Sequence, residues 1–451
     1  MIRRPERSEA KSRDLFSLEN KTGPSTTPRF AGLRSGRRGV ILGAVATLAS
    51  PSLLRAQGAA RVVVVGGGFA GASAARTLKK LNPALSVTLV EPNETFTACP
   101  FSNGVLGGVR TLQQQQFKYD NVTKAGVALA RTTATAVDAG GRTVTLADGN
   151  KLAWDRLVMT PGIDIRWDAL AGYDEAAAER MPHAWRAGQQ TVLLRRQLES
   201  MPDGGLFVMS APANPFRCPP GPYERASLIA HYFKARKPKS KILILDAKDA
   251  FSKQRLFTDA WKKLYPDMIE WVGLSKGGKV TSVDPATLTL TTDFGQHKAA
   301  VANIVPPQKA AAIAAQAGVT NASGWCPVDP NTFESTQVPN IHVVGDAAIM
   351  GAMPKSAFSA NSQAKALAQV IVDRLAGRKP PEPRLINTCY SLVSPDYGIT
   401  VAGVYRPDKG QLADIPGAGG TSPVDADDGF RGLEAQYAEG WFKTITAEVF
   451  G

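Results

Sequence analysis

Histidine and cysteine are scarce in this chain of 451 residues, which has four of each. The cysteines lie far apart, with no Cys-x-x-Cys pair, no Cys-x-x-Cys-His motif and no histidine beside them. Zinc sites and attached haem use such short spacings, so the sequence disfavours both and no metal site is expected. Any chemistry of the cysteines must depend on residues that folding brings together.

A membrane-spanning run is missing near the amino terminus. The apolar stretch at residues 40–54 is shorter than the ~20 residues that a spanning helix needs, and Pro51 interrupts it. It follows Arg37 and Arg38, and small residues typical of a cleavage site come next, so segment 1–58 is predicted to be a twin-arginine export signal. A retained N-terminal anchor is the alternative. Because this route carries folded proteins, it indicates a cofactor loaded before export and a periplasmic location, where a disulfide is admissible.

The formal net charge is +14, and residues 1–58 supply half of it through 11 Lys/Arg against 4 Asp/Glu. Basic residues do not form runs with interleaved aromatics, so nucleic-acid binding is not expected. The remaining charge suits an anionic substrate or an acidic partner. With 43% hydrophobic and 20% charged residues, the chain can bury a substantial core in two or three domains.

The segment after residue 58 has the pattern of a dinucleotide-binding unit. Residues 62–65 are four valines, as in a buried parallel strand, and Gly66, Gly68 and Gly71 follow in the spacing GxGxxG. The glycines permit a tight turn, close approach to a pyrophosphate, and close packing of a helix expected at 70–81. A glycine turn that serves packing alone is the alternative.

Two further features favour FAD as the dinucleotide. A strand expected at 86–90 ends at Glu91, whose carboxylate is placed to bind ribose hydroxyls. Far downstream, a strand at 341–344 runs into Gly345 and Asp346. In flavoproteins with two dinucleotide domains, such a strand returns to the first domain and its acid meets the ribityl chain. A helix-capping role for Asp346 is the alternative.

A second unit of this type lies between these fragments. The strand at 157–159 leads to Thr160-Pro161-Gly162, which resembles the crossover out of an FAD domain and is expected to contribute Gly162 to the site. A strand at 206–209 and a later strand ending at Asp246 repeat the topology. The turn after the first of these strands, at 210–220, has no glycine but has bulky residues and four prolines. We therefore expect a degenerate nicotinamide domain and no use of NAD(P)H.

Cys99 lies in TACPFSNGVLGG, where the chain in this fold passes the isoalloxazine ring. A thioether to the flavin is one role for it, and a buried thiol is the alternative. This segment, with RVVVVGGGFAGASAA, NPFRCPPGPYERA, GWCPVD, IHVVGDA, MPKSAFSANSQ and NTCYS, resembles the flavoprotein subunit of flavocytochrome c sulfide dehydrogenase. The resemblance covers nearly all of the chain after residue 58, including a carboxyl-terminal flavin-binding segment that ordinary pyridine nucleotide reductases do not share.

The resemblance implies that Cys99 is the covalent attachment point for FAD and that Cys218 and Cys389 form a redox-active disulfide over the flavin. It gives Cys326 no role, so a buried thiol is expected there. Glu224 resembles the family's acid near the disulfide and would relay the proton from sulfide. A surface carboxylate near a helix start is the alternative.

The chemistry of sulfide agrees with these roles. Hydrosulfide is a soft nucleophile, and a disulfide offers it an electrophilic sulfur, so attack leaves a persulfide on one cysteine and a thiolate on the other. The thiolate can then reduce the flavin by two electrons. After Asp346 the spacing becomes helical, and the helix N-terminus and Lys355 are expected to stabilise negative charge on the reduced flavin. A solvated lysine is the alternative.

With no nicotinamide site and no haem motif, the chain must pass its electrons to another carrier, and the resemblance implies a c-type cytochrome subunit. One helical face carries Phe430, Leu433, Tyr437, Trp441 and Ile445, and we expect this face to pack within the protein. The resemblance implies that it packs over the flavin, with Trp441 near the ring. One alternative is a sulfide:quinone reductase, which would need this apolar helix to reach membrane quinone. The other is a flavin-binding assembly protein without turnover.

The expected fold is a glutathione-reductase-like α/β flavoprotein with two dinucleotide-binding domains. The FAD-binding domain is expected at 59–170 and 310–379, the degenerate middle domain at 171–309, and a flavin-binding cap at 380–451. FAD is the expected cofactor and sulfide the expected substrate.

Overall fold

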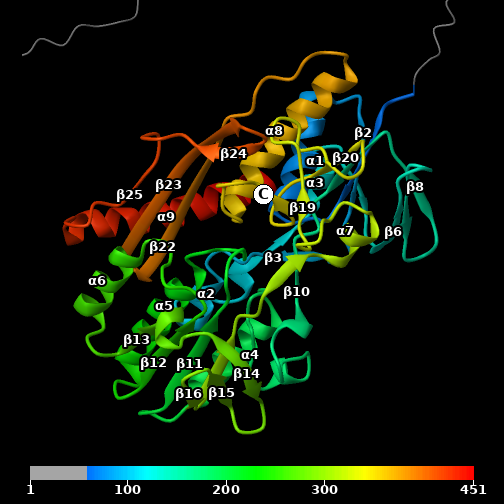
Figure 1. The fold of residues 1–451 in the computed structure, drawn as a ribbon. Helices are drawn as coiled ribbons and strands as arrows, with labels where there is room; N and C mark the ends of the chain where they lie inside the picture. The colour runs from blue at the N-terminus through cyan, green and yellow to red at the C-terminus, as the bar shows by residue number, and fades with distance from the viewer. Residues whose placement is uncertain (1–57) are drawn as a thin grey trace, which may run out of the picture. The chain divides into compact units, whose positions relative to one another are not determined.

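The computed structural model describes residues 58–451, so the expected export signal lies outside the described residues apart from Gly58. Figure 1 shows two parallel α/β units and an antiparallel sheet that packs with the last helix. The predicted fold class, with two dinucleotide-binding units and a carboxyl-terminal domain, is therefore confirmed.

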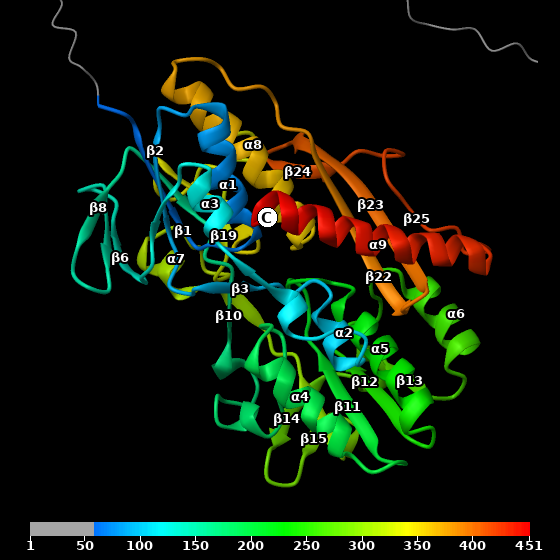
Figure 2. The ribbon, with the colours of Figure 1, turned by 180° about the vertical axis from the view of Figure 1, so that it is seen from behind.

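The first unit is built on a parallel sheet in the order β20-β9-β1-β2-β5. Its central strand β1 is a run of valines with neighbours on both sides, which explains a continuous apolar pattern instead of an alternating one. Helices α1 and α8 lie side by side against it (Figures 1 and 2). The bounds are β1 Arg61–Val65, α1 Phe69–Leu81, β2 Ser86–Val90, β5 Ala128–Ala130, β9 Arg156–Met159, β20 Ile341–Val343 and α8 Ala357–Leu375.

Shorter elements follow in this part of the chain, and of these α2 packs against two helices of the middle unit. The strands β6, β7 and β8 form an antiparallel meander, and α7 contacts β6. The strands β3 and β4 pair with each other, as do β19 and β21. The bounds are β3 Thr95–Thr97, α2 Ser102–Leu106, β4 Gln116–Lys118, α3 Asp120–Lys124, β6 Ala134–Asp138, β7 Thr143–Leu146, β8 Lys151–Ala153, α7 Ala312–Gln316, β19 Cys326–Pro327 and β21 Ala348–Ile349.

The middle unit has a second parallel sheet, in the order β13-β12-β11-β17. The chain enters and leaves it through two short strands, β10 and β18, which pair antiparallel close to the expected domain boundaries. The bounds are β10 Ile163–Ile165, α4 Gln189–Ser200, β11 Leu206–Ala211, α5 Gly221–Arg236, β12 Lys241–Asp246, α6 Gln254–Leu264, β13 Ile269–Val272, β14 Val280–Asp284, β15 Thr289–Thr292, β16 Gly295–Lys298, β17 Val301–Ile304 and β18 Gln308–Ala310.

The carboxyl-terminal sheet pairs the long strands β22 and β23, and β24 and β25 extend it. Strand β22 contacts α8 of the first unit and α5 of the middle unit, so its residues meet both. Figure 2 shows helix α9 across this sheet, with its end near α1 and α3. The bounds are β22 Leu385–Ser394, β23 Tyr397–Asp408, β24 Gln411–Asp414, β25 Gly420–Thr421 and α9 Asp428–Val449.

The expected packing of the apolar face of α9 is wrong for its first half. Phe430, Leu433 and Tyr437 are 40%, 47% and 60% exposed, and the helix instead buries Arg431 and Glu434, which form an ion pair at 3.1 Å. Serine and backbone groups of the preceding loop also satisfy this pair, so a polar face can point inward. Among the described residues, no helix is both long enough and apolar enough to cross a membrane.

Candidate functional site

A pocket of about 1290 Å³, here called the nucleotide pocket, lies at the carboxyl ends of β1, β2 and β20. Ligands of open parallel sheets bind at this edge. Most residues predicted to bind the cofactor line it: Gly66, Gly68, Glu91, Cys99, Gly162, Gly345 and Asp346. Of the two that do not, Gly71 lies beneath the pocket in α1, and Trp441 lines a second pocket described below.

The glycine loop has the geometry that its spacing predicts. A Cβ on Gly71 would lie 1.8 Å from the carbonyl oxygen of Gly66, so only glycine lets α1 approach β1 this closely. Gly66 has a φ of +101°, and its Cβ would meet the carbonyl oxygen of Thr160 at 2.4 Å. A Cβ on Gly68 would meet nothing closer than Phe96 at 3.5 Å, so this residue faces the open pocket.

The two predicted acids of the nucleotide pocket differ in their hydrogen bonding. Glu91 accepts from the backbone N–H groups of Gly67 at 2.8 Å and Asn93 at 2.9 Å, so it also holds the glycine loop in place. Asp346 Oδ1 is buried without a partner, and burial raises the pKa of this carboxyl. Its Oδ2 lies 3.9 Å from the Arg217 guanidinium. An unpaired carboxylate oxygen beside a glycine loop and a helix N-terminus fits a dinucleotide such as FAD.

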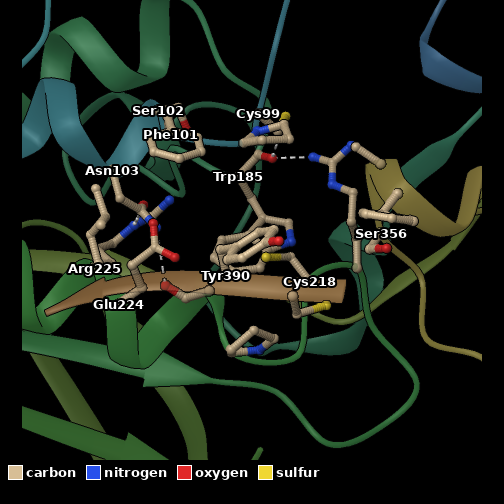
Figure 3. A pocket seen from close by; sticks show the side chains of 18 of the residues that line it. Cys99, Phe101, Ser102, Asn103, Trp185, Cys218, Glu224, Arg225, Ser356 and Tyr390 are labelled. Atoms are coloured by element: carbon tan, nitrogen blue, oxygen red, sulfur yellow. Dashed lines mark hydrogen bonds between the residues drawn. The ribbon is translucent and has the colours of Figure 1, made fainter. Parts of the chain in front are cut away.

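A second pocket of about 830 Å³ adjoins the first and is here called the cysteine pocket (Figure 3). The first unit contributes Cys99, the middle unit Cys218 and Glu224, and the carboxyl-terminal domain Cys389 and Trp441. The residues that line both pockets are Cys99, Pro100, Arg217, Ser356 and Ala357. The predicted sulfur residues and the glycine loop therefore belong to one continuous site.

Cys218 lies in the turn that starts α5. Its φ is +58°, and its backbone N–H donates to the carbonyl of Lys355 at 2.8 Å, which ties this turn to the start of α8. Burial, followed by the nearby Glu224 and Cys389, raises the pKa of its thiol. All four cysteines of the chain are free thiols in the structure, so the expected bond between Cys218 and Cys389 stays a prediction.

Cys389 is on β22 and has a different environment. Its sulfur lies 3.3 Å from Asn387 Nδ2, which can donate to it. Burial raises the pKa of the thiol, but the Lys253 ammonium and the Asn387 side chain oppose this rise. Negative charge is therefore better supported on Cys389 than on Cys218.

Glu224 is buried in the first turn of α5, which excludes the alternative of a surface carboxylate. Burial raises its pKa to about 7, although Lys253, Asn103 and Arg225 favour the ionised form. Asn103 Nδ2 donates to Glu224 Oε1 at 3.3 Å and its own oxygen accepts from Arg225 Nε at 3.0 Å. A carboxyl with a pKa near neutrality can exchange protons at working pH.

Trp441 lies at the aromatic end of the cysteine pocket. Its ring stacks on Phe358 at a centroid distance of 5.9 Å and an angle of 9°, and it meets Tyr390 at 5.9 Å. These rings enclose the part of the pocket that α9 covers.

Lys355 does not line either of these pockets. Its Nζ donates to the carbonyls of Asp346 at 2.8 Å and Ala348 at 2.7 Å, and it lies 4.0 Å from the centre of the Trp325 ring. Burial lowers its pKa to about 8. Its expected role in stabilising charge on the reduced flavin stays a prediction, while its backbone carbonyl accepts from the Cys218 N–H. Cys326 is buried, and burial raises its pKa to about 12.

Asp246, the acid at the end of β12, is bonded to other side chains of the middle unit. The buried carboxylate of Asp246 accepts from Tyr223 at 2.6 Å and from Trp271 at 2.9 Å, and Lys248 also pairs with it. In a nucleotide-binding unit this acid would be open to ribose hydroxyls. Here its oxygens already have protein partners, which agrees with the degenerate turn seen in the sequence.

Sequence reasoning missed several residues of the site. Asn103, Trp185, Arg225 and Tyr390 line the cysteine pocket, and Lys253 contacts its wall. Asn103, Arg225 and Tyr390 lie within segments that carry the family resemblance, which is the signal that could have marked them. Trp185 lies in none of these segments. Nothing in the sequence alone marks Lys253, which sits between two elements of the middle unit.

Comparison with known families gives three matches along the chain. Residues 60–192 match the pyridine nucleotide-disulphide oxidoreductase family. Residues 191–306 match the central domain of the sulfide dehydrogenase [flavocytochrome c] flavoprotein chain, and residues 381–450 match the flavin-binding domain of flavocytochrome c sulphide dehydrogenase.

Individual proteins agree with these matches. A sulfide dehydrogenase [flavocytochrome c] flavoprotein chain from Chlorobaculum thiosulfatiphilum is 67% identical over 48 residues, which are 11% of this chain and all of that sequence. The mitochondrial sulfide:quinone oxidoreductase of Mus musculus is 21% identical over 63% of this chain and 65% of its own. The sulfide:quinone oxidoreductase structure from Aquifex aeolicus shares the fold, with a TM-score of 0.67 and 17% identity over 86% of this chain and 92% of its own. This chain belongs to the flavoprotein family of flavocytochrome c sulfide dehydrogenase.

Proposed function

We propose that this protein is an FAD-dependent sulfide dehydrogenase that oxidises sulfide to sulfur or polysulfide through a Cys218–Cys389 disulfide and passes the electrons to a c-type cytochrome. One observation carries the proposal. Two cysteines from different domains line a single pocket, and this pocket shares a wall with the nucleotide pocket. A sulfur reaction and an electron acceptor can therefore meet without movement of either domain.

The two cysteines do the sulfur chemistry. Hydrosulfide forms an S–S bond with one sulfur, the bond between the cysteines breaks, and its electron pair stays on the other sulfur as a thiolate. Glu224 accepts the proton that hydrogen sulfide loses when it becomes hydrosulfide. Asn387 donates to the Cys389 sulfur and so supports the charge that develops there.

The nucleotide pocket would hold FAD through the glycine loop, Glu91 and Asp346, with Cys99 as its covalent attachment point. FAD, when bound, accepts electrons in pairs and releases them singly. Cys99 lines both pockets, so an attachment there would fix the flavin ring between the glycine loop and the two redox cysteines. The start of α8, which lines both pockets through Ser356 and Ala357, would direct its positive end toward the same region.

Electrons must leave toward a one-electron carrier. The acid of the middle unit is bonded within the protein, which gives no support for a nicotinamide partner. We also propose that the protein has a twin-arginine signal and a periplasmic location. A c-type cytochrome is the electron acceptor that suits this location.

The test is sulfide-dependent reduction of a purified soluble c-type cytochrome by the full protein. We expect Cys218→Ser and Cys389→Ser each to abolish it and Cys326→Ala, outside the pocket, to keep it. A Cys218→Ser variant with full sulfide oxidation would refute the proposal and support a flavin-binding assembly protein instead.

One observation favours a quinone acceptor as the second candidate. The exposed residues Phe430, Leu433 and Tyr437 make an apolar strip on α9, next to the Trp441 end of the cysteine pocket. Such a strip suits contact with a membrane surface. Faster reduction of a short-chain quinone than of cytochrome, lost on substitution of Leu433 and Tyr437 by serine, would favour this candidate.

A further inference from the structure

Lys253 is a buried cation that connects the middle unit to the carboxyl-terminal sheet. It precedes α6, is 8% exposed, and has a φ of +61°. Its Nζ donates to the carbonyl of Cys389 at 2.8 Å, to Ser391 Oγ at 2.8 Å and to the carbonyl of Ile399 at 3.1 Å. These three acceptors use all three protons of the ammonium group and belong to β22 and β23.

None of these three acceptors carries a charge. Burial of an ammonium group destabilises the fold unless nearby negative charge compensates for it. The groups that can do so, in decreasing order of their effect on Lys253, are Cys389, Glu224, Cys218 and Glu434. Three of these four belong to the proposed sulfur chemistry, and the fourth, Glu434, is already paired with Arg431.

The surroundings of Cys389 and Glu224 also point to Lys253. Lys253 is the strongest of the influences that oppose the effect of burial on each of these two groups. The other charged and polar groups that face the pair come from separate elements. They are Asn103 on α2, Cys218 before α5, Arg225 on α5, Ser356 before α8, Asn387 and Ser391 on β22, and Glu434 on α9.

We propose that Lys253 is a positioning residue of the sulfide reaction, whose buried ammonium fixes β22 against the middle unit and stabilises negative charge on Cys389 and Glu224. This proposal rests on the proposed function. When sulfide opens the Cys218–Cys389 bond, a new S–S bond forms on Cys218 and the electron pair of the broken bond stays on Cys389. Lys253 and Asn387 favour that placement of the charge, and Glu224 holds the proton removed from sulfide.

The test uses the reactivity of Cys389 in the full protein with Cys218→Ser, so that no disulfide forms between these two positions. The rate of alkylation by iodoacetamide is measured from pH 7 to 11.5 by mass spectrometry of the peptide that contains Cys389. Because only the thiolate reacts, the midpoint of this profile reports the thiol pKa. Adding Lys253→Met should raise the midpoint by about one unit and slow alkylation about tenfold at pH 7.5.

Three further variants separate charge from structure. Lys253→Arg should restore most of the rate, and Lys253→Gln, which keeps two N–H donors without charge, should behave like Lys253→Met. If Lys253→Met does not fold, Lys253→Gln carries the test. Lys262→Met removes the same charge from the exposed surface of α6 and should change nothing.

An unchanged midpoint in the folded Lys253→Met or Lys253→Gln variant would overturn the proposal. The readout does not need turnover. If the Lys253 variants shift the midpoint while the parent enzyme fails to oxidise sulfide, the proposed function is refuted and the electrostatic role of Lys253 stands.

Discussion

Replacement of Glu224 by glutamine gives the most complete test of the proton path. The change keeps the shape of the side chain and the oxygen that accepts from Asn103 Nδ2 at 3.3 Å, but it removes the ionisable group. As a proton acceptor, Glu224 must be ionised, so wild-type activity should rise with pH through about 7, its pKa in the fold. Loss of a positioned base lowers turnover by about 100-fold or more.

The same substitution has a predicted effect on stability. Burial raises the pKa of Glu224 from 4.5 to about 7, so between these values the folded protein binds a proton that the unfolded chain has lost. Stability therefore falls as pH rises through this window. Between pH 5 and pH 8 the loss is about 2 to 3 kcal/mol, at about 1.4 kcal/mol per pKa unit. Glu224→Gln should lack this loss.

Two assays check these expectations. Sulfide oxidation is followed from pH 5 to 9, and the ratio of wild-type to variant rates removes the ionisation of sulfide itself, which both proteins share. Urea unfolding at pH 5 and pH 8 gives the stability difference. Glu270→Gln, an exposed site on β13, is the matched control. A wild-type to variant rate ratio that does not change across pH 7 would refute the proposed proton transfer by Glu224. A difference in unfolding free energy between wild type and Glu224→Gln that is the same at pH 5 and pH 8 would refute the raised pKa.

Two more predictions concern the cofactor and the end of the chain. After acid precipitation, wild-type protein should keep its yellow flavin in the pellet and Cys99→Ser should release it; complete release from the wild type would remove the covalent role of Cys99. Phe450→Ala should lower the free energy of unfolding by about 3 kcal/mol, because this ring packs on Phe96 at 5.0 Å and Phe117 at 5.6 Å. Denaturant titration measures it, with the exposed Phe294→Ala as control, and a loss below about 1 kcal/mol would contradict this packing argument.

The sequence predicted the nucleotide-binding unit nearly residue by residue. The strand at 86–90 has the bounds of β2, and those expected at 62–65 and 157–159 lie within β1 and β9. These patterns are local: a β-branched run sets a buried strand, and glycines at fixed spacing set the turn and helix that follow. The return of β20 to this sheet was also predicted, because the Gly345-Asp346 pair that follows the strand is a signal within a short stretch of sequence.

The polar support of the site could not be predicted in this way. Lys253 bonds to Cys389 and Ser391 because β22 packs against the middle unit, and no spacing in the chain encodes that contact. The prediction that the apolar face of α9 is buried was wrong for a related reason. Helical periodicity states which residues share a face, but the loop that satisfies Arg431 decided that the polar face turns inward.

The proposed reaction requires a bond between two sulfurs contributed by separate domains. The most direct measurement is peptide mapping of the purified enzyme under non-reducing conditions, after free thiols have been blocked with an alkylating agent. We predict a cross-linked pair of peptides containing Cys218 and Cys389, which separates after treatment with sulfide or dithiothreitol. Full alkylation of both cysteines in a preparation that still oxidises sulfide would contradict the proposed disulfide mechanism.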